Sequence, residues 1–182
     1  MEILLIVIFL FILLICIIAI IYAGIYNKFQ DYIIRINEVE SIIDSNLRKK
    51  YDLINRAIPI IKSNIPNDKD ICSEIVKLRS RKISNFELYR VLERGTSEIN
   101  SLKEEFPAIQ ESEEIKKILD SILEIDNIVE ESALYYNDNI SIYNSLLKKF
   151  PSNIVGNLSK YKEKLFFDRK DMNDEDYNDF KL

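Results

Sequence analysis

The chain opens with an unbroken apolar run, in which no charged residue occurs from Ile3 to Ile25. As a helix rising 1.5 Å per residue, this run would be roughly 34 Å long, slightly more than the ~30 Å hydrocarbon core of a bilayer. A cleavable signal peptide would instead begin with basic residues and carry a shorter apolar stretch before a small-residue cleavage site. The pattern therefore predicts an uncleaved transmembrane anchor over residues 1–25.

Two long polar stretches follow, each with apolar residues at steps of three and four, which is typical of helices with one buried face. They predict helices over residues 26–65 and 112–150, each about 60 Å long and therefore able to pack side by side. The first seam comprises Ile36, Val39, Ile43, Leu47, Ile54, Ile58, Ile61 and Ile65. The second comprises Ile115, Ile118, Ile122, Ile125, Val129, Tyr136, Ile140, Tyr143, Leu147 and Phe150, interrupted only by Ser132.

The segment between these helices is predicted to form a middle arm in two pieces. The first piece is a helix over residues 72–78, and the second begins at a capping box made by Ser84 and Glu87. Gly95 and the threonine after it would add an irregularity, and Pro107 would end the arm.

Prolines and charge shape the remaining elements. Pro59 lies inside the first long helix, where a kink or local opening is expected. Pro151 ends the other long helix, and a short helix is predicted over residues 152–167. Residues 168–182 are acidic with little apolar content, which predicts a disordered tail. The predicted fold is all-α: a transmembrane helix, then a long antiparallel bundle over residues 26–167 with three long arms and a short C-terminal helix.

Charge refines the membrane prediction. Lys28 and Arg35 follow the apolar run and no base precedes it, so the positive-inside rule places the N-terminus outside and the polar domain in the cytoplasm. The chain holds 25 Lys and Arg against 30 Asp and Glu, a net charge of −5. Nucleic-acid binders show a clustered basic excess, so this class is excluded from the expected partners.

The composition argues against most catalytic sites. Histidine is absent, and Cys16 and Cys72 are the only thiols, which excludes the usual zinc sites and histidine-dependent catalysis. Because one cysteine lies in the apolar run and the other in a polar helix, both are expected to be unpaired in a reducing compartment. The acidic pairs at 113–114 and 130–131 lack an accompanying nucleophile or metal set. We therefore expect no enzyme activity, cofactor or metal.

The order of several short motifs resembles the LemA family of bacterial membrane proteins. They are the apolar span ending in Tyr26-Asn27, the string from Asn46 to Ile54, Val76-Lys77-Leu78-Arg79, Glu105-Phe106-Pro107, Tyr136-Asn137, Tyr143-Asn144 and Phe150-Pro151-Ser152-Asn153. The chain departs from the family at Lys50 and Ala133, where the family usually has arginine, and at Asn55, where it usually has proline. The resemblance implies a single span followed by a cytoplasmic antiparallel bundle, without implying a known reaction.

Several polar or aromatic residues are candidates for contact with a partner. For each of them, a purely structural role is the alternative. Tyr136, Asn137, Tyr143 and Asn144 could present a polar patch, or they could fill the core and bond a neighbouring helix to fix its register. Phe150 and Pro151 complete this set. Arg79 is expected to pair with Asp52 or Glu105. The basic runs at 48–50 and 79–82 are interpreted as solvated surface rather than lipid contacts.

The leading hypothesis for function is a membrane-anchored helical scaffold that binds unidentified membrane or cytoplasmic proteins or self-associates. The alternative is an accessory subunit of a membrane enzyme, such as a protease system, recognised through its transmembrane helix. A lipid-organising protein or an envelope-stress sensor is a third class.

Overall fold

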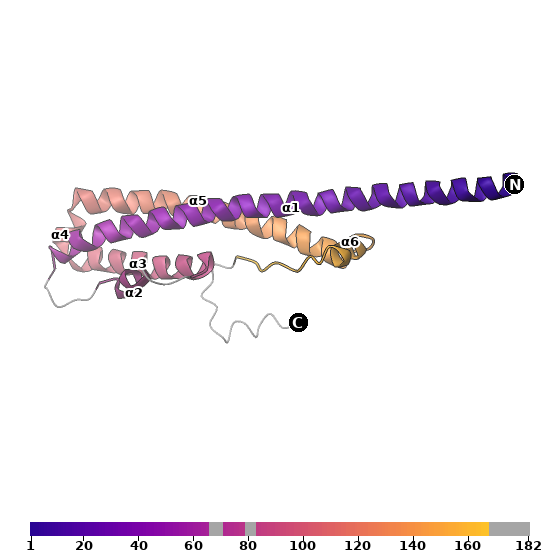
Figure 1. Ribbon diagram of the computed structural model, residues 1–182. Coiled ribbons are helices and arrows are strands. Elements are labelled where there is room, and N and C mark those ends of the chain that lie inside the picture. Colours follow the sequence, from indigo (N-terminus) through magenta and orange to yellow (C-terminus); the bar gives the residue numbers. More distant parts are fainter. Residues whose placement is uncertain (66–70, 79–82, 168–182) are drawn as a thin grey trace. The chain divides into compact units, whose positions relative to one another are not determined.

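The computed structural model describes residues 1–65, 71–78 and 83–167, and within these ranges all regular elements are helices (Figure 1). The expected acidic tail at 168–182 lies outside the described residues. The helices are α1 (Glu2–Lys62), α2 (Ser73–Lys77), α3 (Asn85–Glu105), α4 (Pro107–Gln110), α5 (Glu113–Lys148) and α6 (Ser152–Leu158). The predicted all-α class is confirmed, and so is a middle arm made of two main pieces, α2 and α3.

Helix α1 runs without a break for 61 residues, from the apolar run into the polar part of the chain. It is the one helix among the described residues that is long and apolar enough to cross a membrane, and its most apolar window is not buried inside the protein. Pro59 lies in its last turn. Instead of opening there, the helix continues to Lys62, and the Ser63 amide donates to the Pro59 carbonyl at 3.1 Å.

The predicted seams are confirmed over most of their length. Every residue of the first seam is buried, although α1 ends at Lys62 and Ile65 follows it. Helix α5 buries its seam from Ile115 to Val129 and again at Ile140 and Tyr143. The prediction is wrong at Phe150, which is 80% exposed because α5 has already ended at Lys148. Ala133, rather than its neighbour Ser132, is buried between the two parts of the seam.

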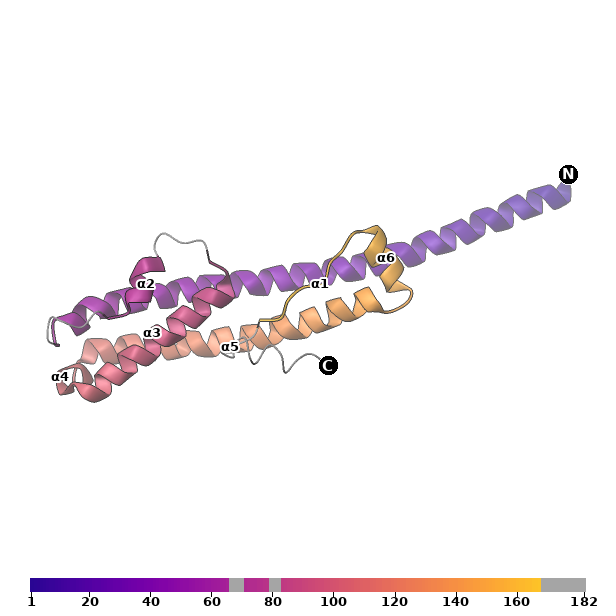
Figure 2. The ribbon, with the colours of Figure 1, turned by 90° about the horizontal axis from the view of Figure 1, so that it is seen from below.

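The chain divides into two compact units, and α1 and α5 contribute to both. The first unit comprises residues 1–39 and 135–166. Its core cluster joins Phe29 and Ile36 of α1 to Ile140 and Tyr143 of α5 and to Val155 of α6. Figure 2 shows α6 lying across α1 rather than along it, and in Figure 1 α6 lies below α1.

The short C-terminal helix is shorter than predicted, because α6 ends at Leu158 rather than at 167. Lys160 follows in the left-handed region with a φ of 56°. The Tyr161 amide donates to Gly156 and the Lys160 amide to Asn157. This pair of hydrogen bonds around a left-handed residue is the Schellman motif, which satisfies the last carbonyls of a helix and turns the chain away.

Among the described residues, the second unit comprises those between 40 and 134 together with Phe167. The predicted capping box is confirmed in part, since the Ser84 hydroxyl accepts a hydrogen bond from the Glu87 amide at 3.1 Å. The irregularity expected at Gly95 is absent, and α3 continues through it. Gly95 is buried beneath Ile75 of α2, so this glycine serves close packing rather than a break.

Candidate functional site

The two Tyr-Asn pairs lie in the first unit, and the second pair holds the chain after α6. Tyr143 is buried, and its ring meets that of Phe29 edge-on at 5.7 Å between centroids. Burial, followed by the proximity of Tyr161, raises the pKa of Tyr143. Asn144 donates to the Lys164 carbonyl at 2.9 Å and accepts from the Lys164 amide at 3.0 Å. Tyr143 is thus a core residue, and Asn144 acts as a clamp on the backbone.

Tyr161 is a residue of this site that the sequence analysis missed. Its hydroxyl accepts a 2.6 Å hydrogen bond from the Gln30 amide, and its ring lies 5.1 Å from that of Phe29 and 6.3 Å from that of Tyr26. The clamp by Asn144 and this stacking together hold the segment after α6 against α1. The family motifs found in the sequence end at Asn153, so none of them marked Tyr161 as a further aromatic contact.

The remaining candidates have different surroundings. Tyr136 is half-buried and packs against the core cluster of the first unit. Asn137 is half-buried on the same helix. Pro151 precedes α6 and follows Phe150 in a cis peptide bond. Arg79 lies outside the described residues, so its predicted ion pair is not described either. The structure therefore brings Tyr136 and Tyr143 to one cluster and leaves Phe150 on the surface.

A pocket of about 440 Å³ lies beside the Asn144 clamp. Its rim carries an ion pair between Lys148 and Glu163 at 3.1 Å, with both side chains exposed. The other lining residues are polar or basic, apart from one exposed phenylalanine: Ser141, Asn144, Ser145, Lys149 and Phe166. Hydroxyls, an amide and ammonium groups can hold a ligand's polar groups, but this lining contains no nucleophile paired with a base.

The structure contradicts the interpretation of the basic run at 48–50 as solvated surface. Arg48 and Lys49 are exposed, but Lys50 is fully buried in the second unit. Its ammonium group forms ion pairs with Glu93 of α3 and, at 2.6 Å, with Asp126 of α5. The signal was present in the sequence, because Lys50 falls on the apolar seam between Leu47 and Ile54. A buried cation at a seam position needs partners of opposite charge.

Cys72 and Glu98 link α2 to α3 in the same unit. Cys72 is buried in the left-handed conformation, with a φ of 51°, and its amide donates to both carboxylate oxygens of Glu98 at 3.1 and 3.2 Å. Burial, followed by the nearby charge of Glu98, raises the pKa of the Cys72 thiol to about 12. A thiol held protonated in this way is a poor nucleophile. Both cysteines are free, as expected.

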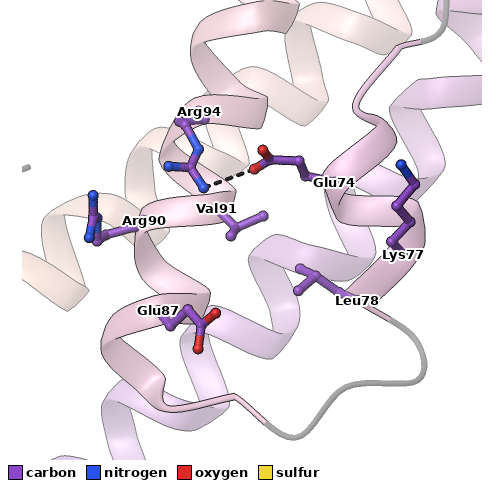
Figure 3. Close-up of a pocket in the computed structure, with 7 residues that line it drawn as sticks. All are labelled: Glu74, Lys77, Leu78, Glu87, Arg90, Val91 and Arg94. Carbon is purple, nitrogen blue, oxygen red and sulfur yellow. Dashed lines mark hydrogen bonds and ion pairs between the residues drawn. The ribbon is translucent and has the colours of Figure 1, made fainter.

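Figure 3 shows a pocket of about 290 Å³ between α2 and α3. Glu74 and Arg94 form an ion pair across it at 2.8 Å, and Val91 and Leu78 supply apolar lining (Figure 3). Lys77, Glu87 and Arg90 complete the lining, so charges of both signs are interspersed. Because positive and negative side chains are mixed in this lining, the pocket does not electrostatically favour an anionic or a cationic ligand. Among the described residues, no group of three or more His, Cys, Asp or Glu side chains is placed to hold a metal.

Comparison with known proteins supports the resemblance noted in the sequence. No curated protein matches the chain. The sequence profile of the LemA family, however, matches residues 39–178, which is most of the chain. The matched region contains the buried Lys50, the Asn144 clamp and both Tyr-Asn pairs. The chain therefore belongs to the LemA family, a group of membrane-associated proteins.

Proposed function

We propose that this protein is a non-enzymatic interaction module of the bacterial cell membrane, anchored by the first part of α1 and presenting its helices to protein partners in the cytoplasm. The anchoring is supported by the apolar run of α1, which the rest of the protein leaves uncovered. The cytoplasmic placement rests on Lys28 and Arg35 after that run. The absence of histidine removes the commonest general base from the chain.

The observation that carries this proposal is a set of large apolar side chains on α5 that the protein leaves exposed. Leu123 and Leu134 are each 61% exposed. They are separated by about three helical turns, which places both on one face of the helix. Ile128 of α5 is also exposed, but it lies about 120–140° around the helix from these two leucines. Exposed apolar side chains repeated along one helix are typical of surfaces that pack against a partner helix or a second copy of the chain.

Site-specific photo-crosslinking in intact cells tests the proposal. A photoreactive amino acid is placed at Leu123 or Leu134 on α5, and for comparison at Leu10 or Leu14 in the span. The same set is repeated after residues 3–25 are replaced by an unrelated apolar span. We expect discrete adducts from the α5 positions that persist after the replacement.

The alternative function, an accessory subunit recognised through its membrane helix, predicts the opposite pattern. Adducts would then form at Leu10 or Leu14 and disappear when the span is replaced, while the α5 positions would stay unlinked. An enzyme would be indicated only if the purified chain showed turnover that substitution of one polar side chain abolished.

A further inference from the structure

Helix α6 carries an apolar face that the protein does not cover. Ile154 and Leu158 are exposed and four residues apart, so they lie on one face of α6. Exposed Phe150 lies two residues before the helix. The opposite face is used for packing, since Val155 belongs to the core cluster of the first unit and Gly156 lies against Leu147 and Phe29.

This face lies at the level where the apolar run of α1 ends. The Tyr22 hydroxyl is 3.5 Å from that of Ser159, directly after α6, and the Tyr26 ring is 6.3 Å from that of Tyr161. Beyond this level α1 continues toward its N-terminus alone in both ribbon views (Figures 1 and 2). With the run of α1 in a bilayer, α6 would lie across the helix at the boundary between lipid and water. Tyrosines are enriched at that boundary.

The charge around α6 differs from that of the whole chain. Residues 148–164 contain five lysines and one glutamate, a net charge of +4 in a chain whose total is −5. Lys149, Lys160 and Lys162 are exposed, and Lys160 and Lys162 flank Tyr161 at the level of the span's end. Lysines beside an apolar helix face are the pattern of elements that bind anionic membrane surfaces.

We propose that α6 and the turn after it form an interfacial lipid-binding element of the same membrane that α1 crosses. Ile154 and Leu158 enter the boundary between headgroups and acyl chains, and Lys160 and Lys162 bind phosphates of anionic lipids. This inference rests on the proposed anchoring. A lipid surface is favoured over a protein partner because Tyr22 and Tyr26 of the same chain place α6 beside the bilayer.

The test uses the absence of tryptophan from the chain. Ile154→Trp introduces one indole on the α6 face, and Tyr135→Trp is a matched control in the same unit, since the parent side chains are 50% and 49% exposed. Position 135 lies roughly 20 Å along α5 from its C-terminal end. Each full-length variant is reconstituted into vesicles of phosphatidylcholine with 30% phosphatidylglycerol, and quenching by brominated phosphatidylcholine is measured.

We expect bromolipid quenching and a blue-shifted emission for Ile154→Trp, and neither for Tyr135→Trp. In vesicles without phosphatidylglycerol, or after Lys160→Gln with Lys162→Gln, the quenching should fall by at least half. Flotation of the vesicles reports anchoring separately. Floating protein whose Ile154→Trp indole escapes bromolipid would overturn the lipid assignment while leaving the anchor intact. If that indole were also shielded from aqueous iodide, a second copy of the chain would be the occupant. Protein that does not float would overturn both proposals.

Discussion

Lys50 of α1 donates a 2.6 Å hydrogen bond to Asp126 of α5 while its own side chain is fully buried. Because Glu93 of α3 binds the same ammonium group, one cation joins three helices of the second unit. Removing one partner from a buried pair leaves the other charges uncompensated, which costs more than the intact pair contributes to stability.

Lys50→Met should therefore destabilise the protein. We expect the free energy of unfolding to fall by about 2–4 kcal/mol. This is less than the full cost of breaking a completely buried ion pair, because both carboxylates are partly exposed. Urea unfolding of the full chain in detergent, followed by circular dichroism, measures it. Lys49→Met changes the exposed neighbour and should shift stability by less than about 0.5 kcal/mol. Equal effects of the two substitutions would show that burial of Lys50 has no energetic consequence.

Gly95→Ala should loosen α2 from α3. A Cβ atom at this position would overlap the Ile75 side chain, and both residues are buried. Overpacking of this kind costs about 1–3 kcal/mol, partly offset by the better helix propensity of alanine. Ile75→Val removes the overlapping methyl group, so the double variant should be more stable than the sum of the single effects predicts. Ser97→Ala, on the exposed side of α3, is the control. If the stability changes of Gly95→Ala and Ile75→Val were strictly additive, the close packing of Gly95 against Ile75 would be contradicted.

The Cys72 thiol should react slowly in the folded protein. With Cys16→Ala as the background, a maleimide or disulfide reagent at pH 8 should label Cys72 far more slowly than it labels the urea-unfolded chain, because burial and a pKa of about 12 keep the thiol protonated. Labelling at the same rate in both states would contradict the buried position.

The same pKa predicts a pH dependence of stability. The folded-state pKa is raised above the ordinary value of 9.0, so the folded state binds the thiol proton more tightly. The resulting stabilisation is complete below pH 9 and is lost as the pH rises toward 12. The free energy of unfolding of the parent should therefore fall relative to that of Cys72→Ala between pH 8 and pH 11. A constant difference over this range would rule out the shift.

Asn144→Ala should release the segment after α6. Both hydrogen bonds between Asn144 and the Lys164 backbone are lost, at about 1 kcal/mol each. Exchange of the Lys164 amide hydrogen should accelerate about tenfold, as measured by hydrogen exchange with mass spectrometry. Ser141→Ala, one turn earlier on the exposed side of α5, should leave that exchange rate unchanged. An unaltered exchange rate in Asn144→Ala would show that Asn144 does not hold the backbone at Lys164.

The sequence predicted the long helices because their apolar spacing is regular over many turns. Burial of the α1 seam from Ile36 to Ile65 follows from that spacing alone. The basic run around Lys50 was misjudged because its composition is typical of a surface, whereas its burial depends on Glu93 and Asp126, which lie far away in the chain. The end of α6 was missed for a local reason, since nothing in its composition marks Lys160 as a left-handed residue.

The candidate site was predicted only in part. Tyr143 was named as a core filler or a contact residue, and its packing on Phe29 supports the first interpretation. Asn144 was expected to bond a neighbouring helix, but it binds the extended backbone after α6 instead. That segment was itself predicted to be helical, so the error about its structure concealed the correct partner.

The central claim is that α1 anchors the chain in the membrane with the polar domain on the cytoplasmic side. Protease treatment of intact spheroplasts, combined with alkaline carbonate extraction of the membranes, tests it most directly. The account predicts that the chain stays in the membrane pellet and that a C-terminal epitope is digested only after the spheroplasts are lysed. Release of the chain into the carbonate supernatant, or digestion of the epitope in intact spheroplasts, would contradict it.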